Sequence, residues 1–363
     1  MVLTPHAMSL ARRRFMQGLG AAGIAAASSA LPFARAQNRG TAWRIDVHHH
    51  FVPPLFRQVA STHGLLNHYL TGMSLVRSLE AMDRNEVATT VLSIPAPGVW
   101  YGKVNLARQI ARDANDFAAT AAREHRGRFA MFATLPLPDV EGSLAEVAYA
   151  CDHLHAEGIH MWTNYGDFWI GDPRLTPLLE ELNRRRAVVF VHPRTPQCCA
   201  NLLPQVPDQI IEYGTDTTRA IASLVFSGAA HAFPAIRWIF CHAGGTMPFL
   251  IGRFQYLGRV QGRTAEGASK IPHGVMYELK RLYFDTAQSA NPYALGPLKR
   301  LVDTSHILLG TDFPYRTVGG DVRGLASCGL FAPGDLQMIE RDNALRLMPE
   351  LAQVASRRHE QRE

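Results

Sequence analysis

Three consecutive histidines stand between an apolar run and two prolines in RIDVHHHFVPP, residues 44–54. The apolar run is typical of a β-strand, in which successive residues point to opposite faces. We therefore expect His48 and His50 on one face, together with Asp46, and His49 on the other. Two imidazoles on one face of a strand end can bind the same metal ion. His49 cannot reach that ion and is expected to pack against a helix.

Three later apolar runs also end in reactive side chains: His192 in VFVHP, His242 in FCHAGG and Asp312 in LLGTDFP. An imidazole from His192 and a carboxylate from Asp312 would complete a four-ligand shell with His48 and His50. The remaining coordination position would then hold water or substrate. Each residue taken alone could be an ordinary polar residue at a strand end. Their recurrence at several strand ends predicts a single divalent metal ion.

Eight short apolar runs after residue 40 indicate the strands that position these side chains: 43–49, 88–95, 129–137, 158–163, 187–193, 236–245, 282–287 and 306–314. Stretches with helical spacing separate them, namely 72–84, 103–126, 142–157, 174–186, 217–232 and 335–348. This alternation predicts a parallel α/β sheet, either an open sheet or a (β/α)₈ barrel. The first and eighth runs can build one site only if the sheet closes. A shared metal site therefore predicts the TIM barrel.

The first 36 of the 363 residues differ in composition from the rest. They contain four of the arginines and no acidic residue, and without them the net charge of +6 falls to +2. The absence of a clustered basic stripe argues against a nucleic-acid partner. ARRRFMQ (11–17), an apolar Gly/Ala-rich stretch and ARA (34–36) resemble a twin-arginine export signal with a cleavage site.

We therefore expect residues 1–36 to be a cleaved signal read by the twin-arginine export machinery, which would place the protein in the periplasm or outside the cell. An uncleaved anchor or a disordered tail is the alternative. Residues 37–363 are expected to form a single barrel domain. The five cysteines fit no zinc-finger spacing and are expected to be structural or incidental: Cys151, Cys198, Cys199, Cys241 and Cys328.

The motifs DVHHHFVPP, VFVHP, FCHAGGTMPFL and LLGTDFPY resemble, in order and spacing, those of the amidohydrolase superfamily. The branch that contains aminocarboxymuconate-semialdehyde decarboxylase is the most similar. Residues 215–254 look especially like 6-methylsalicylate decarboxylases, and the likeness runs from about Ile45 to Pro349. The resemblance implies a metal-dependent (β/α)₈ enzyme that uses zinc or manganese and acts on small carboxylates. The branch commonly forms dimers, which implies a homodimer.

Carried over position by position, the resemblance implies that the metal ligands are His48, His50, His192 and Asp312. It also implies that His242 is the acid/base residue. Two-metal relatives carry a bridging lysine at the end of the fourth strand, but this sequence has no lysine between Lys103 and Lys270. A mononuclear site is therefore expected.

Two reactions suit such a site. The preferred one is non-oxidative decarboxylation of a small aromatic or unsaturated acid, which would make the protein a carboxy-lyase. The alternative is hydrolysis of a lactone, ester or amide by a metal-activated water. A binding protein that has lost catalysis is a third hypothesis, and the intact set of reactive residues argues against it.

Four residues are candidates for contact with the substrate. Arg194 could pair with a substrate anion or form a surface salt bridge. Trp162 and Phe51 suit a flat ring, although aromatic residues near barrel mouths are also packing residues. Arg219 fits the decarboxylase-like segment, or it braces a helix.

Overall fold

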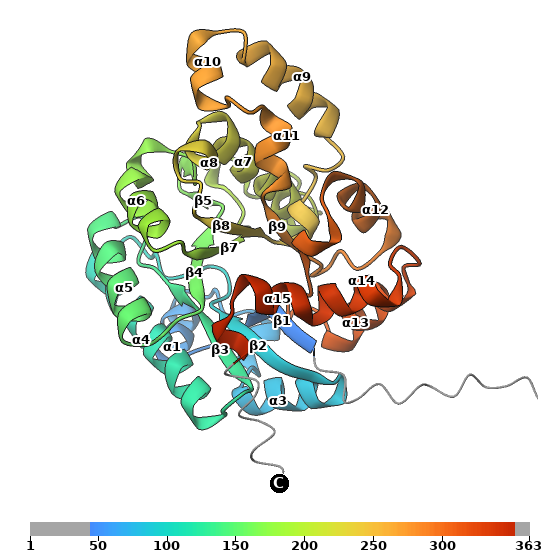
Figure 1. Cartoon of the computed structure of the whole chain (residues 1–363). Helices are drawn as coiled ribbons and strands as arrows, with labels where there is room; N and C mark the ends of the chain where they lie inside the picture. Colours follow the sequence, from blue (N-terminus) through green and yellow to red (C-terminus); the bar gives the residue numbers. More distant parts are fainter. Residues whose placement is uncertain (1–43, 353–363) are drawn as a thin grey trace, which may run out of the picture. The chain divides into compact units, whose positions relative to one another are not determined.

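The computed structural model describes residues 44–352. The predicted export signal, residues 1–36, lies outside this range. Within the described residues, eight parallel strands form one sheet in the order β1-β2-β3-β4-β7-β8-β9-β10 (Figure 1). Their bounds are β1 Arg44–His50, β2 Val87–Ser93, β3 Phe129–Thr134, β4 Gly158–Trp162, β7 Val188–His192, β8 Arg237–Phe240, β9 Tyr283–Asp285 and β10 Ile307–Leu308. Each strand falls on one of the eight apolar runs.

The sheet closes between its first strand and the segment that follows its last. A parallel bridge joins His49 to Phe313. The backbone nitrogen of His50 donates to the Phe313 carbonyl over 2.8 Å, and that of Val47 donates to the Leu309 carbonyl over 2.9 Å. The predicted (β/α)₈ barrel is therefore confirmed, and the open sheet is excluded.

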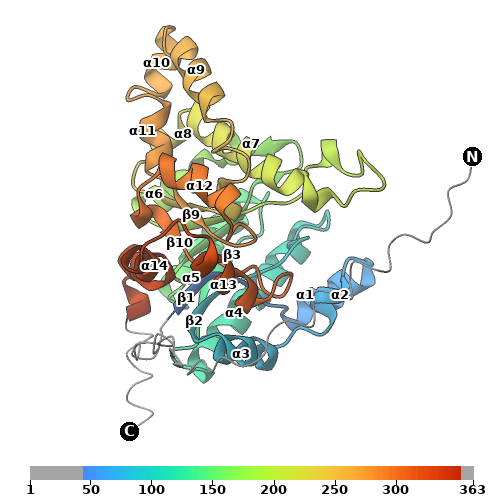
Figure 2. The same ribbon diagram turned by 90° about the vertical axis from the view of Figure 1, so that its right-hand side faces the viewer.

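Helices surround the strands (Figures 1 and 2). The first seven are α1 Pro54–Thr62, α2 His68–Thr71, α3 Leu75–Arg84, α4 Val104–Glu124, α5 Val140–Asp152, α6 Thr176–Arg184 and α7 Glu212–Phe226. The others are α8 Ala229–Ala232, α9 Ile251–Gln261, α10 Ala265–Lys270, α11 Val275–Lys280, α12 Pro292–Leu301, α13 Val318–Ser327, α14 Pro333–Gln337 and α15 Asn343–Leu347. None of these helices is long and apolar enough to cross a membrane.

The long helix α4 shows why these segments are helical. Its buried residues recur at the i, i+3, i+4 and i+7 spacing of one helix face, as in Ala107, Ile110, Ala111 and Ala114. The small alanine side chains let the helix lie close to the strands. Ser74 begins α3 by accepting from the backbone nitrogen of Arg77, which satisfies one of the free donors at the helix start.

Two features were not predicted from the sequence. A short hairpin of β5 (Asn164–Tyr165) and β6 (Phe168–Trp169) follows β4. Helices α9 and α10 extend away from the strands in both views (Figures 1 and 2). In addition, α5 ends at Asp152 and is shorter than the predicted helical stretch 142–157, so His153 and His155 lie beyond it, and both are exposed.

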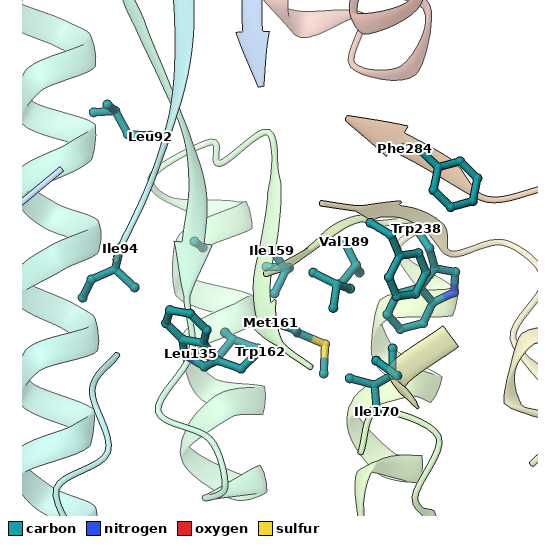
Figure 3. Close-up of a cluster of buried hydrophobic side chains, with 14 of the residues drawn as sticks. Leu92, Ile94, Leu135, Ile159, Met161, Trp162, Ile170, Val189, Trp238 and Phe284 are labelled. Atoms are coloured by element: carbon teal, nitrogen blue, oxygen red, sulfur yellow. The ribbon is translucent and has the colours of Figure 1, made fainter. Parts of the chain in front are cut away.

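Buried apolar side chains form two clusters. The larger lies between the strands and the helices, and Figure 3 shows Leu92, Ile159 and Val189 among its members. The smaller gathers strand residues with α15, and its Phe132 and Phe190 rings stack 5.0 Å apart. Because Phe190 also contacts the His48 ring at 5.1 Å, this cluster lies directly beneath the histidines. The reactive side chains are therefore supported from below by a well-packed apolar cluster.

Candidate metal centre

The ends of four strands bring the predicted site residues together. His48 and His50 end β1, His192 ends β7, and His242 lies in the turn that follows β8. Asp312 follows β10, and its backbone nitrogen donates to the His48 carbonyl over 2.8 Å. Both His242 (φ +55°) and Asp312 (φ +54°) have left-handed backbone conformations. Such conformations are uncommon outside glycine and cluster at functional sites.

The polar atoms of three of these residues converge on one point. His48 Nε2 lies 3.3 Å from His50 Nε2 and 3.3 Å from Asp312 Oδ1. His50 Nε2 lies 2.9 Å from the same carboxylate oxygen. His49 points away from them: its Nε2 lies 2.9 Å from Ser78 Oγ of α3. The structure therefore has His48 and His50 on one face and His49 on the other, as the alternation predicts, but the alternation is wrong for Asp46.

Asp46 lies with His49 rather than with His48, because its Oδ2 atom is 3.2 Å from His49 Nδ1. The pairing register of β1 with β2 shifts between Asp46 and His49, and this irregularity breaks the strict alternation. Asp46 Oδ1 accepts from the backbone nitrogens of His48 and Thr311 over 3.0 and 3.1 Å. It therefore joins β1 to the segment that carries Asp312.

His192 and His242 complete the group. His192 Nδ1 donates to the Pro193 carbonyl over 2.7 Å, which leaves Nε2 as the nitrogen with a free lone pair. That Nε2 atom is buried and has no hydrogen-bond partner among the described residues. His242 Nε2 lies 3.4 Å from Asp312 Oδ2. One ligand atom each from His48, His192, His242 and Asp312 falls within 4.8 Å of the others.

A carboxylate that the sequence analysis did not single out orients these side chains. Asp285 ends β9 and is fully buried. Its Oδ2 atom accepts from His48 Nδ1 over 2.8 Å, and its Oδ1 atom accepts from the backbone nitrogen of His242 over 2.9 Å. Such carboxylates fix the tautomer and ring orientation of metal-binding histidines. Asp285 lies within the apolar run 282–287 and could have been recognised as another reactive strand end.

Burial and charge set the protonation states within the group. Burial lowers the pKa of His192 well below its usual value, and the neighbouring imidazoles of His50 and His48 lower it further. Burial would raise the pKa of Asp312, but the imidazoles of His48, His242 and His50 outweigh burial and hold that pKa well below its usual value. A neutral imidazole and an ionised carboxylate are the forms that bind metal ions.

This donor set fits one divalent metal ion. Imidazole nitrogens and a carboxylate oxygen suit zinc and manganese alike. The unpartnered Nε2 of His192 is accounted for by such an ion, because a buried polar atom without a partner is costly. No lysine stands at the end of β4, where Trp162 pairs in register with His192. The residues therefore match a mononuclear site.

Aromatic rings surround the centre. The Trp162 ring lies 5.5 Å and the Tyr213 ring 6.1 Å from the His192 ring, and the Tyr315 ring lies 5.6 Å from that of His50. Burial raises the pKa of Tyr213 to about 12, so its hydroxyl remains a hydrogen-bond donor at neutral pH. Tyr213 and Tyr315 were not predicted as residues of the site, although Tyr315 is the last residue of the LLGTDFPY motif.

Arg194 follows β7 and is partly buried. Burial lowers the pKa of its guanidinium, and the surrounding groups are Tyr165, Tyr213 and Asp216. Within residues 44–352 the guanidinium forms no ion pair. The alternative of a surface salt bridge is therefore not supported by the described part of the chain.

The structure also places three further residues near the barrel mouth or on α7. Phe51 is buried and stacks on Phe117 of α4, because the residue after His50 points to the opposite face; its prediction as a substrate contact is wrong. Arg219 pairs with Glu212 (3.3 Å) on its own helix α7, so it braces the helix. His160 lies buried beside Trp162, and its Nε2 atom has no hydrogen-bond partner within the described range.

Comparison with known proteins agrees with this architecture. A family model described as Amidohydrolase matches residues 45–349. The decarboxylase yanB of Aspergillus niger is 33% identical over 334 residues, which are 87% of this chain and 90% of that protein. The 6-methylsalicylic acid decarboxylase of Penicillium expansum is 34% identical over 277 residues, covering 75% of this chain and 85% of the relative.

Solved structures show the same fold. An amidohydrolase II structure superimposes with a TM-score of 0.78 at 25% identity, covering 84% of this chain and 99% of the other. A dihydroxybenzoic acid decarboxylase from Polaromonas, solved with manganese and 2-nitroresorcinol, gives a TM-score of 0.74 at 20% identity, covering 84% and 96%. The barrel, its group of histidines and aspartate, and the family match lead to one conclusion: the chain belongs to the amidohydrolase family.

Proposed function

We propose that the protein is a metal-dependent, non-oxidative decarboxylase of a small aromatic carboxylic acid similar to 6-methylsalicylate. The observation that carries this proposal is the convergence of His48, His50, His192, His242 and Asp312 at the mouth of the barrel. Relatives with at least 33% identity over most of the chain are named as decarboxylases, two of them as 6-methylsalicylic acid decarboxylases.

We propose that the resident metal is zinc, with manganese as the alternative. His48, His50, His192 and Asp312 would hold it. A bound divalent cation would act as a Lewis acid toward the oxygens of the substrate. The orientation of His48 by Asp285 and of His192 by the Pro193 carbonyl keeps both Nε2 atoms directed to one position.

The reaction needs one proton at the ring carbon that bears the carboxylate. His242 Nε2 and Asp312 Oδ2, 3.4 Å apart, form the pair that holds and delivers this proton. When the ring carbon is protonated, the bond to the carboxylate breaks, and its electron pair returns to the ring as carbon dioxide leaves. The side chain amide of Gln288 donates to Asp312 Oδ2 and helps to orient that oxygen.

The substrate is recognised by charge and shape. Arg194, which lacks an ion pair within residues 44–352, would bind an anionic oxygen of the substrate. The rings of Trp162, Tyr213 and Tyr315 would contact a flat aromatic ring.

The test uses the metal-loaded protein with two panels, one of 2-hydroxybenzoates that includes 6-methylsalicylate and one of lactones and esters. Carbon dioxide and released acid are measured in parallel. We expect carbon dioxide from an aromatic acid and none after chelation. Acid release without carbon dioxide would contradict the proposal and identify a hydrolase.

We also propose that residues 1–36 direct export by the twin-arginine machinery to the periplasm or beyond. The support is the pair Arg12 and Arg13 and the ARA segment at 34–36. In a host with this machinery, the protein is expected in the periplasmic fraction, shortened by its first 36 residues. The variant Arg12→Lys/Arg13→Lys should stay in the cytoplasm at full length; its normal export would contradict the proposal.

We further propose a homodimer. The support is the family resemblance together with exposed aromatic side chains such as Phe249 and Tyr293, which are 85% and 90% exposed. Light scattering of the purified protein is expected to give twice the chain mass, and a monomer at micromolar concentration would contradict this.

A further inference from the structure

A buried carboxylate on α7 holds the segment that follows β4. Asp216 is fully buried, and its Oδ2 atom accepts from Asn164 Nδ2 over 2.7 Å and from Thr163 Oγ1. Its Oδ1 atom accepts from Trp169 Nε1 over 2.7 Å. The three donors come from the end of β4 and from the β5–β6 hairpin. One side chain therefore fixes this whole segment to α7.

Two of these donors also contact the backbone of Arg194. The Arg194 backbone nitrogen donates to Thr163 Oγ1 over 3.3 Å. Asn164 Nδ2 donates to the Arg194 carbonyl over 3.1 Å. A hydroxyl can donate one hydrogen bond while it accepts another, and an amide NH₂ group has two hydrogens to donate. Each side chain can therefore bind Asp216 and Arg194 at the same time.

The third donor provides an internal comparison. Trp169 binds the same carboxylate through Oδ1, but the structure shows no hydrogen bond between Trp169 and Arg194 within residues 44–352. Loss of its indole N–H would remove a bond to Asp216 without removing either bond to Arg194. Trp169 therefore binds Asp216 alone, whereas Thr163 and Asn164 bind both Asp216 and Arg194.

We infer that Asp216, acting through Thr163 and Asn164, positions Arg194 to bind the anionic group of the substrate. This inference rests on the proposed function in taking Arg194 as the group that binds the substrate anion. Asp216, Thr163 and Asn164 are positioning residues, because they act on the substrate through Arg194. Their effect is expected on substrate binding more than on the rate of the chemical step.

The test measures binding of 2-hydroxybenzenesulfonate, an anionic phenol that has no carboxyl group to lose, to the metal-loaded full chain by calorimetry. Replacement Thr163→Val removes the hydroxyl at nearly constant volume and should weaken binding about 10-fold, as expected for the loss of a buried hydrogen-bond partner. Thr163→Ser keeps the hydroxyl and should restore binding to within about 2-fold. Trp169→Phe should also stay within about 2-fold of the parent.

The Arg194→Ala variant shows whether Thr163 acts on binding through Arg194 or by supporting the site in general. In Arg194→Ala protein, the added change Thr163→Val should weaken binding no further, because the group that it positions is gone. With 6-methylsalicylate, Thr163→Val should raise KM about 10-fold and change kcat by less than about 3-fold. If Thr163→Val is unstable, Asn164→Ala takes its place, with the same expectation.

The inference is overturned if the parent does not bind the sulfonate, or if Thr163→Val binds it as tightly as the parent does. It is also overturned if Trp169→Phe weakens binding as much as Thr163→Val does, or if Thr163→Val still weakens binding in Arg194→Ala protein. Failure of the proposed function has a different signature. The parent would then bind the sulfonate, with the expected differences between variants, but release no carbon dioxide from any benzoate.

Discussion

His48 and Asp285 face each other at the mouth of the barrel, with Nδ1 of the imidazole 2.8 Å from Oδ2 of the carboxylate. This contact fixes the His48 tautomer and directs Nε2 toward His50 and Asp312. Asp285 also accepts from the backbone nitrogen of His242. A single carboxylate at the end of β9 therefore orients groups from two other strand ends.

We predict that Asp285→Ala lowers metal affinity by about 10- to 100-fold, the usual effect of removing a carboxylate that orients a metal-binding histidine. Asp285→Asn keeps an oxygen acceptor and should therefore lose less metal affinity than Asp285→Ala. The affinities are obtained by measuring the metal that each protein retains after dialysis against a series of competing chelators. Equal affinity in Asp285→Ala and the parent would show that His48 is oriented without this contact.

The histidine triplet offers a matched comparison. His50→Ala should lose stoichiometric metal, because His50 Nε2 lies among the converging ligand atoms. His49→Gln should keep it, because His49 binds Ser78 on the opposite face. Metal content by elemental analysis separates the two. Metal loss in His49→Gln with an unchanged melting temperature would contradict the assignment of faces.

Asp312→Asn is predicted to abolish turnover. The amide cannot supply an ionised oxygen to the converging histidines or exchange a proton with His242. We expect a loss of at least about 10³-fold in kcat, since both general acid–base catalysis and ligand charge are affected. Steady-state carbon dioxide release measures it, with circular dichroism confirming the fold. Activity within 10-fold of the parent would remove Asp312 from the mechanism.

A pH effect on stability is expected far from this centre. Glu157 precedes β4, and burial, with a contribution from Glu350, raises its pKa from 4.5 to about 8. The folded protein therefore binds this proton more tightly than the unfolded chain, so the group reduces stability as pH rises from 4.5 to 8. Glu157→Gln should raise the free energy of unfolding by about 1–3 kcal/mol at pH 8 and by little at pH 4.

Urea unfolding at both pH values measures this difference. Glu141→Gln is the control, because the Glu141 side chain is 92% exposed. Its effect on the free energy of unfolding should differ little between the two pH values. A Glu157→Gln gain of the same size at pH 4 and pH 8 would show that the effect comes from packing rather than ionisation.

The strands and the converging residues could be predicted because each apolar run ends in a side chain of distinctive chemistry. Strand alternation correctly separated His49 from His48 and His50. It was wrong for Asp46, because the register shift in β1 depends on pairing with β2 and leaves no mark in the local pattern. The same alternation, applied one residue further, would have placed Phe51 away from the site.

The supporting network was harder to predict. Asp216 and Trp169 are 47 positions apart in the sequence, and the pairing of β4 with β7 brings together the segments that carry their side chains. Tyr213 reaches the centre from the first turn of α7 and Tyr315 from the turn after Asp312, and both placements depend on tertiary contacts. Long-range side-chain hydrogen bonds of this kind have no sequence periodicity. The sequence therefore indicates the reactive residues better than the residues that position them.

The measurement that tests the central claim most directly is carbon dioxide release from 6-methylsalicylate and related 2-hydroxybenzoates by protein of known metal content. We predict release that requires about one metal ion per chain, stops when the metal is removed by chelation, and returns on addition of zinc or manganese. No carbon dioxide from any member of the series by fully metal-loaded protein would contradict the assignment of this barrel as a decarboxylase.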